Sequence, residues 1–347
     1  MPLFLISRLG NDSCPFNFSV WLTNSRQRFE PTMATLTNDV RRLMENIGDM
    51  DKIKRELLAM NFDVNEYPVH CLTKDFIMKG YQHLTQVEQY VLRGDIRSLA
   101  FQSTLHDYFR TIPRLPPPDT RFIDRAFIER EAGQLLSKSQ CEIELLDRNS
   151  RVHQILENYL LNSQGDHGFS LKLRNIFRVN KKEGYNPYMG NEMVLWHGSK
   201  TTSYSAILQC SLNKAPPEAP MSGHMFGKGI YFSDCSTKAA QYCHVPRGGT
   251  GYLMLCLVAL GKSKNLIKGD YSATQLQNEY HSVTGMGKHT FASYDAQLCY
   301  GERDLLVPTG KLVRRPSPDQ YTLQYNEYVV YDQSQVRMAF LLEVEFY

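Results

Sequence analysis

Three segments in the second half of the chain combine residue types that could carry out chemistry. Residues 195–199 read Leu-Trp-His-Gly-Ser, so His197 ends an apolar run and a glycine follows it. Glycine lets backbone N–H and C=O groups approach a planar amide closely. Residues 215–232 form a proline-stiffened loop and a glycine turn that lead into Tyr231. Residues 325–331 place Glu327 in an apolar run. His197, Tyr231 and Glu327 form the core of a candidate site.

Each of these residues also has a purely structural interpretation when it is taken alone. His197 can be a hydrogen-bonded structural histidine, Tyr231 a core residue, and Glu327 the solvent-facing residue of an edge strand. The eight cysteines form no CxxC pair, which suits buried thiols in a reducing compartment. The pair Cys243-His244 near Cys235 fits no usual zinc spacing, so no metal site is predicted.

The elements that must position these segments change in character near residue 137. Leu36, Val40, Leu43, Met44 and Ile47 recur at steps of three and four, which predicts an amphipathic helix that ends near Gly48. Similar spacing continues to about residue 136, with breaks at prolines, and predicts a helical bundle. We therefore expect an unassigned segment at 1–34, a helical domain at 35–136 and a second domain at 137–347.

The second domain alternates short apolar runs with glycine and proline punctuation, which predicts strands with a few helices between them. The predicted strands are Met193–Trp196, Gly229–Phe232, Tyr252–Leu260, Tyr325–Tyr331 and Phe340–Phe346, and the predicted helices are Val152–Leu161, Tyr204–Leu208 and Thr237–Tyr242. Since no βαβ unit with a GxGxxG turn is found, a Rossmann dinucleotide site is disfavoured.

The composition indicates a globular protein and gives no sign of direct nucleic-acid binding or membrane insertion. Hydrophobic residues make up 42% and charged residues 22%, the values of an ordinary globular protein. A net charge of +3, without a basic stripe, does not indicate direct binding to nucleic acid. No apolar run approaches the roughly 20 residues that cross a bilayer, and the first residues do not predict a signal peptide.

From about Leu36 to the C-terminus the sequence resembles the poly(ADP-ribose) polymerases, especially their DNA-damage-responsive branch. The strongest likeness lies in LWHGSKTT (195–202), APPEAP (215–220), MFGKGIYF (225–232) and YNEYVVYD (325–332). The resemblance implies an α+β architecture in which an N-terminal all-α helical bundle precedes a diphtheria-toxin-like ADP-ribosyltransferase domain. That domain would consist of two packed antiparallel sheets that form an NAD cleft.

The resemblance also implies a histidine–tyrosine–glutamate triad at His197, Tyr231 and Glu327. His197 would hydrogen-bond the adenosine ribose, and the backbone of Gly198 would hold the nicotinamide carboxamide. Tyr231 and Tyr242 would enclose the nicotinamide ring, since offset aromatic stacking contributes about 0.5–1.5 kcal/mol beyond burial.

Further NAD contacts are implied for Ser199 on the adenosine side and for Lys238 at the mouth near Glu327. Cleavage of the nicotinamide–ribose bond produces an oxocarbenium-like centre, which a carboxylate in a water-poor site can stabilise. NAD would be a consumed substrate, so the family implies no cofactor and no metal. The acceptors would be proteins, including this chain itself, and Glu327 would orient an acceptor hydroxyl for polymer elongation.

The sequence departs from the family pattern at several places. Ala239 stands where relatives usually carry a serine that accepts from the carboxamide, and Asn213 where they often carry an arginine. These departures keep open a non-catalytic NAD or ADP-ribose binding module and a mono-ADP-ribosyltransferase. The stretch from Pro116 to Cys141 is about one helix too short, which predicts elevated basal activity. DNA would act only through a sensing module absent from this chain, and nuclear residence and a role in DNA repair follow from the family alone.

Overall fold

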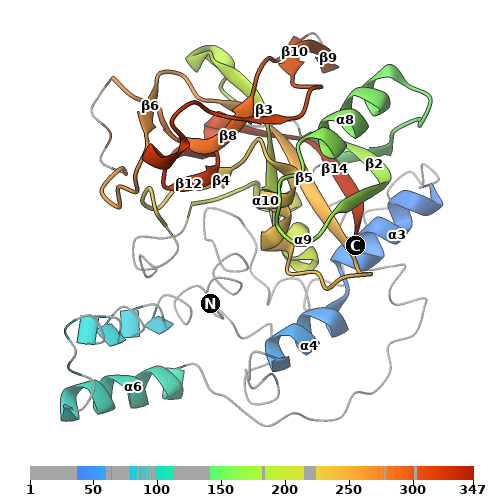
Figure 1. The fold of residues 1–347 in the computed structure, drawn as a ribbon. Helices are drawn as coiled ribbons and strands as arrows, with labels where there is room; N and C mark the ends of the chain where they lie inside the picture. Colours follow the sequence, from blue (N-terminus) through green and yellow to red (C-terminus); the bar gives the residue numbers. More distant parts are fainter. Residues whose placement is uncertain are drawn as a thin grey trace.

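The computed structural model describes residues 37–59, 98–111, 141–181, 184–214, 224–274, 276, 279–300 and 303–347, with scattered residues between 64 and 95. In Figure 1 helix α3 lies beside a region built on strands, whereas α4 and α6 lie away from it. These helices span Asn38–Ile47, Met50–Ala59 and Leu99–Thr111. The described residues between Lys79 and Tyr90 are helical as well. The unassigned segment 1–34 and the last part of the predicted helical domain, residues 112–136, lie outside the described residues.

Helix α3 forms where its apolar spacing predicts. The Thr37 hydroxyl caps its start by accepting from the Val40 N–H at 3.4 Å, and the Gly48 N–H donates to the Met44 carbonyl at its end. The face of α3 is buried in one apolar cluster with strands and helices of the second half of the chain. Its buried residues are Val40, Leu43, Met44 and Ile47. The helix is therefore part of the same core as the strand region.

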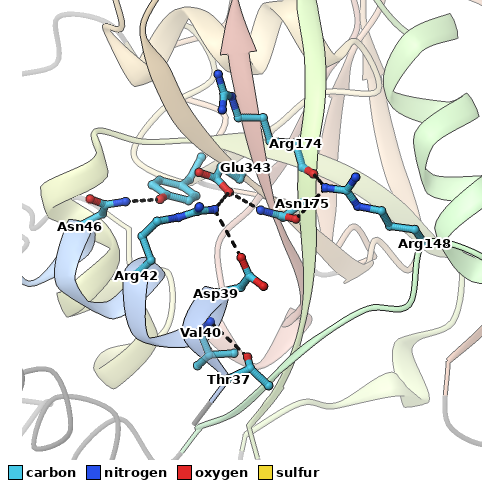
Figure 2. Close-up of polar contacts among 10 residues, drawn as sticks. Thr37, Asp39, Val40, Arg42, Asn46, Arg148, Arg174, Asn175 and Glu343 are labelled. Carbon is cyan, nitrogen blue, oxygen red and sulfur yellow. Dashed lines mark hydrogen bonds and ion pairs between the residues drawn. The ribbon is translucent and has the colours of Figure 1, made fainter.

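A second set of contacts between α3 and the strand region is polar (Figure 2). The Arg42 guanidinium donates to Glu343 at 2.9 Å, and Asn175 donates to the same carboxylate oxygen at 2.7 Å. The Glu343 side chain is only 6% exposed, whereas that of Arg42 is 51% exposed. Asn46 donates to the Tyr252 hydroxyl at 2.9 Å. The Arg42 guanidinium of α3 thus forms an ion pair with Glu343, a buried carboxylate of the strand region.

The central sheet has five strands in the order β1-β2-β14-β5-β3, and every neighbouring pair is antiparallel. Its strands span Cys141–Leu145 (β1), Leu171–Lys181 (β2), Glu192–Gly198 (β3), Thr250–Ala259 (β5) and Val336–Phe346 (β14). Strands β5 and β14 are buried almost throughout, because both faces of this sheet are covered. The helices of this region are α8 (Arg151–Asn162), α9 (Tyr204–Cys210) and α10 (Ser236–Ala240). Strand β3 forms an edge, and the candidate His197 lies on it.

A four-stranded sheet in the order β4-β13-β7-β6 carries the other candidate residues. Its strands are β4 (Ile230–Phe232), β6 (Ser263–Leu266), β7 (Ser282–Gly285) and β13 (Glu327–Val330). Two smaller sheets contain β8 (Gly287–Phe291), β9 (Ala296–Tyr300), β10 (Arg303–Val307), β11 (Leu312–Arg314) and β12 (Leu323–Tyr325). The pairs β6–β7 and β12–β8 are parallel, so the expectation of two purely antiparallel sheets is too simple.

The single strand predicted at Tyr325–Tyr331 is wrong in one respect. The chain forms β12 up to Tyr325 and β13 from Glu327, and the two strands belong to different sheets. The side chain of Asn326 between them is fully buried and accepts from the Gly287 N–H at 2.9 Å. This buried polar residue stands at the break between the two strands, and apolar periodicity carries no signal for it. None of the described helices has the length and apolar character needed to span a membrane.

Candidate active site

The two larger sheets meet at one point, and the candidate residues gather there. The backbone of Trp196 on β3 exchanges two hydrogen bonds with Ser233, just after β4, at 2.8 and 3.0 Å. Because His197 follows Trp196 and Tyr231 lies on β4, this bridge brings them together. Nδ1 of His197 lies 2.9 Å from the Tyr231 carbonyl oxygen. Residues far apart in the sequence are thus joined through the backbone.

The hydrogen bonds of His197 define its tautomer. A carbonyl oxygen can only accept, so Nδ1 carries the proton in its contact with Tyr231. In the neutral ring Nε2 is then an acceptor, and the Ser199 hydroxyl lies 3.2 Å from it. Both side chains are buried. The imidazole and the hydroxyl form a fixed polar pair at the end of β3.

The ring of Tyr231 is held by the glycine turn before its own strand. Its hydroxyl donates to the Gly227 carbonyl at 2.7 Å and accepts from the Phe226 N–H at 3.0 Å. Gly227 has φ +76°, a conformation that side chains with a Cβ rarely adopt. Burial raises the pKa of Tyr231 well above its usual value, and the nearby Glu327 adds to this. The hydroxyl is therefore committed to the turn, and the ring face is what the residue can offer to a ligand.

Glu327 begins β13, which lies between β4 and β7. Its neighbour in register on β7 is Gly285, and Val329 on the same strand pairs with Tyr231. The Glu327 carboxylate lies 3.0 Å from Nζ of Lys238, and their side chains are 13% and 12% exposed. Lys238 also donates to the Tyr325 carbonyl at 2.8 Å. The lysine thus directs the carboxylate and binds the chain beside it.

Helix α10 and the 3-10 helix η4 (Gln241–Cys243) place the remaining residues. A Cβ on Gly198 would lie 1.8 Å from the Ala239 carbonyl oxygen, so only glycine fits where β3 meets α10. Ala239 itself is buried, and Tyr242 is 56% exposed. Burial is the main cause that raises the pKa of Tyr231, and the charges of Glu327 and Tyr242 add to it.

The proline-stiffened loop and Asn213 are the remaining features predicted near the site. Residues 215–223 of the loop lie outside the described residues, whereas His224 sets its ring against Tyr231 with centroids 6.1 Å apart. Asn213 donates to the Cys210 carbonyl at 3.3 Å.

Asp234, Asn326 and Tyr328 were not predicted from the sequence as site residues. All three are buried and hydrogen-bonded to one another around Glu327. An acidic residue two positions after the MFGKGIYF motif was the signal that could have drawn attention to Asp234.

The cysteines differ from expectation at two positions. Cys141, Cys235, Cys243 and Cys256 are buried free thiols, as the sequence predicts. Cys299 is exposed, and Cys210 is disulfide-bonded. Among the described residues, no three His, Cys, Asp or Glu side chains are grouped so that they could hold a metal ion.

Comparison with known proteins identifies the family to which this geometry belongs. Residues 150–346, more than half of the chain, match the poly(ADP-ribose) polymerase catalytic domain. The chain belongs to the poly(ADP-ribose) polymerase family. It therefore carries the catalytic domain of a family of NAD⁺ ADP-ribosyltransferases. Residues 34–126 match the regulatory domain of poly(ADP-ribose) polymerases.

Individual relatives cover most of this chain. It is 32% identical over 345 residues to Poly [ADP-ribose] polymerase 2 of Homo sapiens, covering 88% of this chain and 58% of the relative. With Poly [ADP-ribose] polymerase 1 of Arabidopsis thaliana it shares 31% identity over 352 residues, 91% of this chain and 35% of the relative. The chain thus spans between about a third and three fifths of these longer proteins.

Proposed function

We propose that this protein cleaves NAD between nicotinamide and ribose, transfers ADP-ribose to protein side chains and extends the product into a polymer. The observation that supports this most directly is the convergence of His197, Tyr231 and Glu327 at the junction of β3, β4 and β13. This is the triad implied by the diphtheria-toxin-like fold. The polar pair of His197 and Ser199 suits a ribose diol, and the faces of Tyr231 and Tyr242 suit the nicotinamide ring.

In the proposed reaction the bond between the nicotinamide nitrogen and the ribose carbon breaks, and its electron pair leaves with nicotinamide. The positively charged leaving group needs no general acid. Glu327, directed by Lys238, stabilises the oxocarbenium-like centre through the ribose hydroxyl and orients the acceptor oxygen that attacks it. The acceptor proton then passes to solvent or to the carboxylate. The Gly198 backbone holds the carboxamide where only a glycine fits.

Incubation with labelled NAD followed by gel electrophoresis tests the proposal. A ladder of products indicates polymer, one sharp band indicates a mono-ADP-ribosyltransferase, and an unlabelled protein that still binds NAD indicates a binding module. The buried alanine at position 239 is the feature that favours the binding module. Glu327→Gln should abolish the ladder while NAD binding is retained, because the carboxylate acts on the reaction rather than on the dinucleotide as a whole. A normal ladder from this variant would exclude the assigned role.

We further propose residence in the nucleus and a part in the DNA damage response, supported by the resemblance to the DNA-damage-responsive branch. The DNA-dependent signal would come from a module outside this chain. Fractionation of cells for the protein, before and after DNA damage, tests this. A protein that stays outside the nucleus in both conditions would contradict it.

A further inference from the structure

A buried carboxylate that the proposed reaction does not use is hydrogen-bonded to both chain neighbours of Glu327. Asp234 is 0% exposed and stands between β4, which carries Tyr231, and α10, which carries Lys238. Its Oδ2 accepts from Nδ2 of Asn326 at 2.7 Å and from the Tyr328 hydroxyl at 3.0 Å. These two partners are the residues immediately before and after Glu327. Asp234 therefore holds both chain neighbours of the proposed catalytic carboxylate.

The alternation of side chains along an extended chain gives this contact its meaning. Neighbouring residues point to opposite faces, so Asn326 and Tyr328 reach toward Asp234 while Glu327 points away from it. Glu327 then meets Lys238 at 3.0 Å on its own side. Fixing the residues at 326 and 328 fixes the backbone from which the Glu327 side chain projects.

Asn326 connects this anchor to the surrounding strands. Its Oδ1 accepts from the Gly287 N–H at 2.9 Å, and its backbone carbonyl accepts from the Ser233 hydroxyl at 2.8 Å. Nδ2 also lies within 3.3 Å of the Thr290 hydroxyl oxygen. The side chain is 0% exposed. The break between β12 and β13, where Glu327 begins its strand, is thus held by hydrogen bonds from several directions.

Burying a carboxylate is unfavourable in free energy, because the charged group loses its hydration. We therefore expect Asp234 to have a specific role. Burial raises the pKa of Asp234 to about 6, while the hydrogen bonds from Asn326 and Tyr328 and the charge of Lys238 act in the opposite direction. A carboxylate oxygen can accept two hydrogen bonds at once. A smaller apolar residue would leave the Asn326 amide and the Tyr328 hydroxyl without this acceptor.

We infer that Asp234 is a positioning residue that acts through Glu327: by binding Asn326 and Tyr328 it sets the location of the carboxylate that carries the reaction. The inference rests on the proposed function of Glu327. Asp234 itself stays out of contact with NAD in this assignment. Displacement of a reacting group by about 1 Å can lower a rate by about a hundredfold.

The test measures nicotinamide release by the full chain, with kcat and KM for NAD determined separately. Asp234→Ala should lower kcat by about ten- to a hundredfold and change KM little, because binding surfaces for the dinucleotide remain. Asp234→Asn keeps an acceptor oxygen and should recover most of that loss. A loss confined to the melting temperature, with kcat unchanged, would overturn the inference.

A double-mutant cycle decides whether Asp234 acts through Glu327. In a Glu327→Gln background, Asp234→Ala should cause little further loss of kcat, since there is no carboxylate left to position. An equal fold-loss in both backgrounds would show an independent effect and overturn the inference. Two other outcomes would overturn the proposed function and, with it, this inference. They are a wild type that releases no nicotinamide and a Glu327→Gln variant that releases it at the wild-type rate.

A matched pair of tyrosine variants serves if Asp234→Ala does not fold. Tyr328→Phe removes the hydroxyl that donates to Asp234. Tyr300→Phe, the control, removes an equally buried hydroxyl that donates to the Val179 carbonyl at 2.9 Å. Tyr328→Phe should lower kcat by several-fold, and Tyr300→Phe should leave it unchanged. Equal kcat values for the two variants would refute the positioning role.

Discussion

The ion pair between Arg42 and Glu343 should determine how firmly α3 stays attached to the strand region. Arg42→Met keeps most of the apolar stem but removes the guanidinium that lies 2.9 Å from the carboxylate. Glu343 would then be left buried with Asn175 as its remaining donor in Figure 2. The variant therefore leaves the buried Glu343 carboxylate without its positively charged partner, which is a larger change than the loss of a surface contact.

Burial of the two partners sets the size of the effect. Breaking a fully buried pair costs about 3–5 kcal/mol, whereas an exposed pair contributes about 0–1 kcal/mol. Here Glu343 is 6% exposed and Arg42 is 51% exposed, so water replaces part of the lost interaction. We expect a cost of about 1–3 kcal/mol, which corresponds to roughly a five- to 150-fold increase in the detached state of α3.

Amide hydrogen exchange of α3 in the full chain measures this directly. Arg42→Met should speed exchange of the α3 amides by that factor, and adding Glu343→Gln should restore much of the protection by removing the stranded charge. Arg55→Met is the matched control, because Arg55 makes exposed contacts, an ion pair with Asp49 at 3.9 Å and a hydrogen bond to the Asp51 carbonyl at 3.3 Å. If Arg42→Met and Arg55→Met give the same exchange rates, the anchoring role of Arg42 is refuted.

Further outcomes are expected elsewhere in the chain. Gly198→Ala should abolish activity or folding, because its Cβ would lie 1.8 Å from the Ala239 carbonyl oxygen, while Gly310→Ala, with nothing within 4 Å, should match the wild type in the nicotinamide assay. Ala239→Ser should tighten NAD binding by about tenfold in calorimetry by adding one hydrogen bond, and unchanged affinity would contradict this. Since the pKa of Asp234 is raised to about 6, its protonated form stabilises the fold below pH 4, and roughly 3 kcal/mol of this is lost as pH rises through 6. Asp234→Asn should lack this loss in thermal unfolding between pH 4 and 7, and parallel curves would refute it. Finally, nicked DNA should leave the initial rate of this chain nearly unchanged, and a strong increase would contradict the expectation of elevated basal activity.

The elements with strong periodicity could be predicted from the sequence. The predicted strand Phe340–Phe346 lies within β14, and Tyr252–Leu260 corresponds to β5, because long apolar runs leave few other options. Strand β2 (Leu171–Lys181) was missed although it pairs with β14 at the centre of the sheet, since charged residues interrupt its apolar pattern. Alternation alone does not reveal such a strand, because pairing between distant segments decides its place.

The residues of the candidate site could be predicted from the sequence, but the packing that brings them together could not. Motif spacing singled out His197 and Glu327, and the structure brings their strands together at the sheet junction. The backbone bridge between Trp196 and Ser233 could not be foreseen, because it depends on how two sheets pack rather than on side-chain type. The buried network at Asn326 escaped for the same reason.

The shared core of α3 has a practical consequence for dissecting this protein. Val40, Leu43, Met44 and Ile47 pack into one cluster with residues of α9, among them Ile207 and Leu208. A fragment that starts at residue 137 would uncover this apolar patch and leave Glu343 without its cation, and such surfaces promote aggregation. Its low activity would then report damage to the fragment rather than relief from inhibition. A shortened protein intended for kinetics should retain residues 37–48, so that the catalytic region keeps the helix that completes it.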